Sequence, residues 1–122
     1  MRKQAGFTLI ELVAVMVILS ILAVVAVPQF VDLRTEARAA AVAGVAGALA
    51  SGSSLNFARR SVNPANGVAI TNCTDVTNTL QGTALPAGYT IVAGAITAGN
   101  VVTCTLNGPS GSTATFAAIG IS

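Results

Sequence analysis

The 122-residue sequence contains no histidine and no tryptophan, and only 8% of its residues are charged. Histidine is the commonest general acid–base group and a frequent zinc ligand, so its absence disfavours both kinds of site and leaves Ser51, Ser53 and Ser54 without an activating base. Asp75 is the only acidic residue after Glu36, which argues against a calcium site built from several carboxylates. The net charge of +2 provides no dense basic surface for phosphates. We therefore expect no enzyme, no cofactor and no metal ion, and nucleic acid is not the expected partner.

Cysteine is also scarce, with Cys73 and Cys104 as the only two residues of this type. Both follow a long apolar stretch, and an even pair in an exported domain is typical of a disulfide. Closing a loop of that length stabilises a fold by roughly 3 to 4 kcal/mol in the chain-entropy model. The alternative is a pair of reduced, buried thiols in a cytosolic protein.

The dominant feature of the sequence is an apolar run from Gly6 to Val27, GFTLIELVAVMVILSILAVVAV. No residue from Leu12 to Val31 carries a charge, and about 20 such residues at 1.5 Å of helical rise cover the roughly 30 Å core of a bilayer. The run has no polar stripe, so a helix formed from it must be surrounded by lipid or by other helices. We predict a helix that can span a membrane.

A short polar leader, MRKQAG, precedes this run and carries Arg2 and Lys3. A secretory signal would end its apolar core after 7 to 15 residues at a small-x-small cleavage site. The run here is too long, and its only candidate exit, Ala26 to Pro28, lacks that pattern. A cut at the junction between Gly6 and Phe7 would instead keep the apolar segment on the mature protein.

The residues around this junction carry a resemblance to a known family. Gly6–Val13, with the sequence GFTLIELV, resembles the class III signal of type IV prepilins and pseudopilins, in which a GFTLIE motif follows a short basic leader. The spanning run, Pro28, Phe30 and the alanine-rich continuation are also similar to that family. Beyond about residue 65 the family is variable, so there the resemblance implies an architecture and no detail.

The resemblance implies that a prepilin peptidase cleaves the chain between Gly6 and Phe7, that the new amine of Phe7 is N-methylated, and that Glu11 acts with Phe7 in assembly. It also implies a structural subunit of a type IV pilus, or fimbrium. Such a prepilin is inserted in the inner membrane by a single span, with its head in the periplasm. The pilus assembly machinery then polymerises it, through packing of the N-terminal helices, into an extracellular helical homo-oligomer. Cell adhesion, motility and DNA uptake are the activities that such a filament supports.

The chemistry of Glu11 points independently to a function. A carboxylate at mid-bilayer depth costs on the order of 2.5 to 3.5 kcal/mol, so an acid inside a spanning helix is a functional candidate by default. Glu11 lies four residues after Phe7, about 6 Å along a helix. The ammonium group of Phe7 on an axially offset neighbour could therefore neutralise it. Alternatively, Thr8 and Glu11 form a capping box at the start of the helix, and the two roles are compatible.

The helix is expected to continue past Pro28 as an amphipathic segment to about Phe57. Pro28 removes a backbone donor and predicts a kink or a local loss of helix. Small and branched residues then recur at three- or four-residue spacing and predict a packing stripe, composed of Ala37, Ala41, Val45, Ala48, Gly52 and Leu55.

Four charges follow Pro28 in an unusual order. Asp32 and Glu36 are four residues apart, and so are Arg34 and Arg38, so that like charges occupy neighbouring turns. Each like pair destabilises an isolated helix by roughly 0.2 to 0.5 kcal/mol. We hypothesise that the acidic and basic strips complement each other between subunits. The alternative is a solvated collar just outside the membrane.

The C-terminal half has the composition of strands and turns. Arg59 and Arg60, followed by the turn-forming residues 62–67, predict the end of the helix. Segments 89–93, 100–106 and 113–119 predict strands, 95–97 an edge piece, 107–111 a hairpin loop, and 71–88 a loop held by the disulfide. The fold class is α+β, with a long N-terminal helix packed on a small antiparallel sheet. We divide the chain into a leader (1–6), a transmembrane or filament-core half-helix (7–27), an amphipathic half-helix (28–60) and a small sheet head (61–122).

Two other functions fit part of this pattern. One is a pseudopilin of a type II secretion system, although the expected disulfide and the lack of an evident calcium loop favour the pilin. The other is a monomeric membrane-anchored periplasmic binding module, for which the match to GFTLIE would be coincidental.

Overall fold

The structure, a computed structural model, describes residues 2–122; Met1, the first residue of the expected leader, lies outside them. The chain divides into two units, Met1–Glu36 and Ala37–Ser122, and each is described by itself. A single helix, α1, extends from Leu9 to Val62. The expected end of the helix at about Phe57 was therefore five residues too early.

In the first unit, the chain is non-helical from Arg2 to Thr8 and helical from Leu9 onward. The helix continues through Pro28 without interruption, so no local loss of helix occurs at this residue. Proline lacks the backbone N–H and removes only one bond of the helical ladder. A kink at Pro28 stays a prediction.

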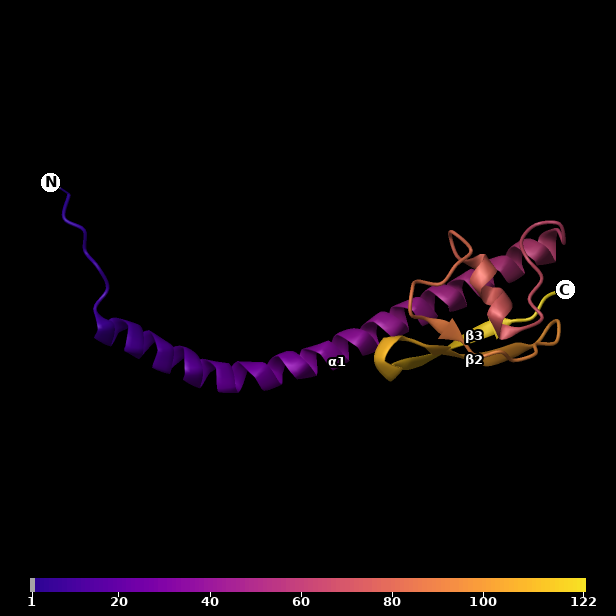
Figure 1. The fold of residues 1–122 in the computed structure, drawn as a ribbon. Helices are drawn as coiled ribbons and strands as arrows, with labels where there is room; N and C mark the ends of the chain where they lie inside the picture. Colours follow the sequence, from indigo (N-terminus) through magenta and orange to yellow (C-terminus); the bar gives the residue numbers. More distant parts are fainter. Residues whose placement is uncertain (1) are drawn as a thin grey trace. The chain divides into compact units, whose positions relative to one another are not determined.

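The second unit contains an antiparallel sheet of three strands in the order β1-β2-β3. The strands are β1 (Thr90–Ile91), β2 (Val101–Asn107) and β3 (Thr113–Ile119). β2 and β3 form a hairpin that pairs from Val101↔Ile119 to Asn107↔Thr113 (Figure 1). The predicted strands at 100–106 and 113–119 are thus confirmed to within one residue. A short 3-10 helix, η2 (Pro109–Gly111), lies in the predicted hairpin loop.

Two other expectations about the head need correction. The segment 95–97 is not a strand, because Ala95 forms only an isolated bridge with Asn72. The loop 71–88 contains a 3-10 helix, η1 (Cys73–Thr79), which begins with a capping box between Asn72 and Asp75. This helix is stabilised by hydrogen bonds between side chains and the nearby backbone. Such bonds do not require apolar residues at a helical spacing, so the pattern of apolar residues could not predict the helix.

The core lies between the C-terminal part of α1 and the sheet. Its helical side chains are Val42, Ala46 and Leu49, and on the sheet they are complemented by Leu106 and Phe116. The remaining buried apolar residues are Ile70, Cys73, Val76, Ile96, Cys104 and Ala118. The long helix packed on a small antiparallel sheet confirms the predicted α+β fold.

The face of α1 that packs on the sheet differs from the predicted stripe. Ala41 and Ala48 of that stripe are exposed, whereas their neighbours Val42 and Leu49 are buried. One residue corresponds to a rotation of about 100° around a helix. The predicted helical spacing of the stripe was therefore correct, but the predicted side of the helix was wrong by about one residue.

Candidate functional site

The Gly6–Phe7 bond lies in the non-helical segment just before α1. Both residues are exposed, and the side chain of Phe7 is 86% exposed. A protease binds its substrate in an extended form, which a helix would not supply. The bond expected to be cleaved is therefore in an accessible conformation.

Thr8 and Glu11 form a capping box, as one of the two interpretations of the sequence predicts. The backbone N–H of Thr8 donates to Glu11 Oε2 at 3.0 Å, and the backbone N–H of Glu11 donates to Thr8 Oγ1 at 3.4 Å. These bonds satisfy two of the four amide groups that a helix start leaves unpaired. The carboxylate also lies in the first turn, where the helix dipole favours negative charge.

This arrangement holds Glu11 close to the amino terminus that the expected cleavage after Gly6 would create. The carboxylate accepts from the amide of Thr8, which is the residue directly after Phe7. Cleavage before Phe7 leaves this amide intact, so the capping box is compatible with processing. Only one oxygen of Glu11 is used as an acceptor in these bonds. The carboxylate can therefore cap its own helix and still accept from an ammonium group.

The apolar part of α1 is uncovered in the single chain. The residues from Arg2 to Phe30 and from Asp32 to Ala41 are exposed, and the large apolar residues from Phe7 to Phe30, together with Leu33, are between 49% and 86% exposed. The helix is long and apolar enough to cross a membrane. Full burial of each such side chain is worth roughly 1.5 to 3 kcal/mol. This surface is therefore suited to lipid or to other apolar helices.

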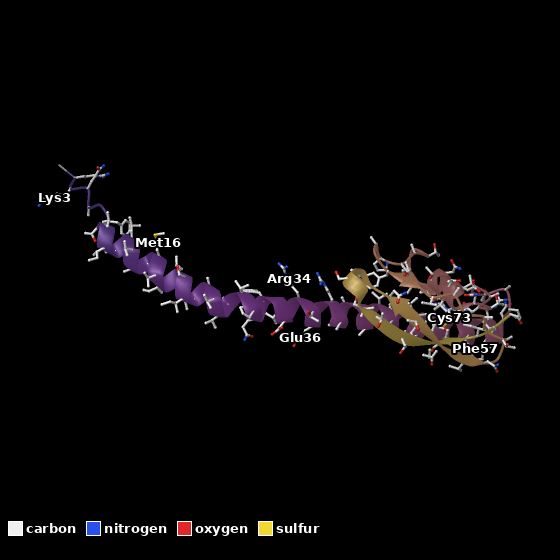
Figure 2. The ribbon with its side chains drawn as sticks, turned by 60° about the horizontal axis from the view of Figure 1, so that its bottom comes forward. Lys3, Met16, Arg34, Glu36, Phe57 and Cys73 are labelled. Atoms are coloured by element: carbon white, nitrogen blue, oxygen red, sulfur yellow. A yellow bond between two sulfur atoms is a disulfide. The ribbon has the colours of Figure 1, made fainter. Side chains whose placement is uncertain are left out.

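The four charges after Pro28 are also exposed. They are Asp32, Arg34, Glu36 and Arg38. The side chains of Arg34 and Glu36 point to opposite sides of the helix (Figure 2). The hydrogen bonds found among residues 2–122 do not involve any of the four side chains.

Two buried polar residues of α1, Ser53 and Asn56, attach the helix to the head. Ser53 is fully buried, and its Oγ accepts from the backbone N–H of Ile119 at 2.9 Å. Asn56 is 5% exposed, and its side-chain amide donates to the carbonyl of Val68 and accepts from the N–H of Val68, both at 2.8 Å. Sequence reasoning did not identify this role of either residue. The only available signal was their spacing of seven and ten residues from the buried position of Ala46.

The predicted disulfide between Cys73 and Cys104 is confirmed. It joins η1 to β2, and both residues are almost completely buried. Reduced, paired thiols of a cytosolic protein are thus not the state found here. Asp75, the acid nearest to this bond in sequence, accepts from the backbone amides of Thr71 and Asn72 at 2.9 Å each. It acts as a cap, and residues 2–122 contain no cluster of three or more His, Cys, Asp or Glu side chains arranged for a metal ion.

Comparison with known proteins identifies the N-terminal segment. Residues 1–27 match the family model described as the prokaryotic N-terminal methylation motif. Neither the curated proteins nor the solved structures provide a match to the chain. The matched range contains the Gly6–Phe7 bond, Glu11 and the whole apolar run from Gly6 to Val27. This motif implies processing by a prepilin peptidase and, together with the apolar helix, anchoring in a membrane. The first 27 residues therefore carry a prokaryotic N-terminal methylation motif, and this motif supports a prepilin that is similar to type IV pilins.

Proposed function

We propose that this protein is the structural subunit of a type IV pilus and has no enzymatic activity. It is inserted in the inner membrane with its head in the periplasm, cleaved after Gly6, methylated on Phe7 and polymerised into an extracellular helical homo-oligomer. The observation that carries the proposal is the position of the Gly6–Phe7 bond. This accessible bond directly precedes a capped helix whose large apolar residues from Leu9 to Phe30 are all exposed.

The uncovered surface supports polymerisation because it suits two environments. A helix that is apolar on every side is stable in lipid, and it is equally stable in a bundle of its own copies. Transfer from the membrane to the filament exchanges one apolar environment for the other, so little hydrophobic free energy is lost. The buried disulfide and the compact sheet give the outward-facing part of the subunit a stable surface.

The proposed assembly contact is the ion pair between Glu11 and the Phe7 ammonium of a neighbour. Removal of either partner would leave an unpaired charge in an apolar environment, which typically costs about 3 to 5 kcal/mol. The free second oxygen of Glu11 supports this contact, since the capping box does not have to open for it.

The test combines mass spectrometry with electron microscopy. We expect the subunit in sheared surface filaments to begin at Phe7 with one added methyl group. Retention of residues 1–6 in the membrane-bound chain would exclude prepilin processing and would favour the membrane-anchored binding module. A processed chain that forms no surface filament, and whose deletion abolishes secretion of exoproteins, would identify a pseudopilin instead.

A further inference from the structure

The charges that follow Pro28 on α1 have no assigned role in the proposed filament. We propose that Asp32, Arg34, Glu36 and Arg38, here called the charged collar, form an asymmetric contact between copies of this chain. In this contact the acidic strip of one copy lies against the basic strip of the next. The proposal rests on the proposed function, because it requires that the helices pack in parallel.

The helical period places the two signs of charge on opposite sides of α1. Asp32 and Glu36 are separated by about 40° around the helix axis, and so are Arg34 and Arg38, whereas Arg34 lies about 200° from Asp32. The helix is continuous over all four residues, and each of them is exposed. The view in Figure 2, in which Arg34 and Glu36 point to opposite sides, agrees with this geometry.

Two opposed strips define the type of contact. A helix with one acidic side and one basic side cannot satisfy both by a two-fold contact of like surfaces. Both sides are satisfied when the acidic side of each copy meets the basic side of another copy. This is a heterologous contact, and it can repeat along an open assembly. At the usual 8 to 10 Å between packed helix axes, carboxylate and guanidinium side chains can meet across the gap. A second copy of the chain therefore supplies the complementary charge.

The collar also agrees with the axial offset needed at the amino terminus. A shift of four residues, about 6 Å along a helix, brings Phe7 of one copy level with Glu11 of its neighbour. The same shift brings Asp32 of the first copy level with position 36 of its neighbour, which lies midway between Arg34 and Arg38. Around the helix axis, Arg34 and Arg38 lie about 140° and 180° from Glu11, so the two charge contacts are made with different neighbours in a bundle.

The surroundings of the collar favour contact with protein over exposure to water. Val27 and Phe30 precede the charged collar, and Leu33 lies within it. These residues are 61%, 66% and 57% exposed, respectively. These side chains continue the uncovered apolar surface of the first unit into the collar. Protein interfaces commonly combine apolar contacts, which contribute affinity, with complementary charges, which contribute specificity. The collar and its apolar neighbours have this composition.

The test exchanges the charges in the full chain, in cells that carry the assembly machinery. The variant Arg34→Glu/Arg38→Glu makes both strips acidic, and Asp32→Arg/Glu36→Arg makes both strips basic. We expect each to be cleaved normally at the Gly6–Phe7 bond and to reduce the yield of sheared filaments at least ten-fold. Arg59→Glu, an exposed charge reversal on α1 outside the collar, is the matched control and should assemble normally.

Restoration of assembly is the decisive result. Co-expression of the two double variants should restore filaments that contain both chains, because an acidic copy then alternates with a basic one. The four-fold exchange should restore filaments of one chain, with the two strips interchanged. Wild-type yield from either double variant would overturn the contact and leave a solvated collar. Failure of both rescues, with cleavage intact, would also overturn it. Failure of the unchanged chain to form filaments would overturn the proposed function itself.

Discussion

The substitution Glu11→Gln separates the two roles that the structure allows for this side chain. Glutamine keeps an oxygen that can accept from the N–H of Thr8, so the capping box, now bonded at 3.0 Å, can persist. It removes the negative charge that the proposed contact with the Phe7 ammonium requires. The matched variant Thr8→Ala does the opposite, because it removes the capping oxygen and leaves the carboxylate.

The two variants should differ strongly in magnitude. Loss of an N-cap side chain costs about 0.5 to 2 kcal/mol, and the 3.4 Å bond to Thr8 Oγ1 places Thr8→Ala near the low end. An ammonium group left without its partner in the filament core costs about 3 to 5 kcal/mol, which corresponds to at least a hundred-fold loss in subunit affinity. We therefore expect Glu11→Gln to abolish filaments and Thr8→Ala to reduce them by only a few-fold.

The assay is the ratio of sheared filament subunit to mature subunit in the membrane, measured by immunoblot. Mass spectrometry of the membrane fraction verifies that cleavage after Gly6 is complete in both variants. Normal filament yield from Glu11→Gln would refute the charge role. A loss with Thr8→Ala as large as that with Glu11→Gln would instead assign the effect of Glu11 to capping.

Two further predictions concern the stability of the second unit, measured by thermal unfolding of the chain in detergent. Cys104→Ser removes the disulfide to Cys73, which is 31 residues away in sequence. In the chain-entropy model this should lower the free energy of unfolding by about 3 to 4 kcal/mol. An unchanged melting temperature would contradict this prediction. Ser53→Ala leaves the N–H of Ile119 without its acceptor and should cost about 1 to 3 kcal/mol. Ser54→Ala, at an exposed position, is the control and should change stability by less than about 0.5 kcal/mol, so equal effects of the two serine variants would refute the role of Ser53.

The main strands and the anchor could be predicted from sequence because their signals are local. The alternation of Val102, Cys104 and Leu106 with Val101, Thr103 and Thr105 predicts β2, since successive side chains of a strand face opposite sides. β1 was predicted at 89–93 but is only two residues long. Its length depends on how far the neighbouring strand can pair with it, which is not a local property.

The side of α1 that packs on the sheet could not be predicted, because two stripes with the same helical period lie next to each other on it. The predicted stripe contains Ala41, Ala48 and Leu55, and the buried one contains Leu49, Ser53 and Asn56. By composition alone the predicted stripe is the more apolar. The polar residues are buried because Ile119 and Val68, distant in sequence, supply hydrogen-bond partners for them.

The sequence by itself determined the parts of this protein whose chemistry depends on near neighbours. These are the expected processing site at Gly6–Phe7, the capping acid Glu11, the apolar run, and the order of charges in the collar. Only the tertiary structure decided which face of α1 meets the sheet and how Ser53 and Asn56 connect to the head. Local patterns reflect the period of a helix or strand, whereas a buried hydrogen bond depends on two segments that meet only after folding.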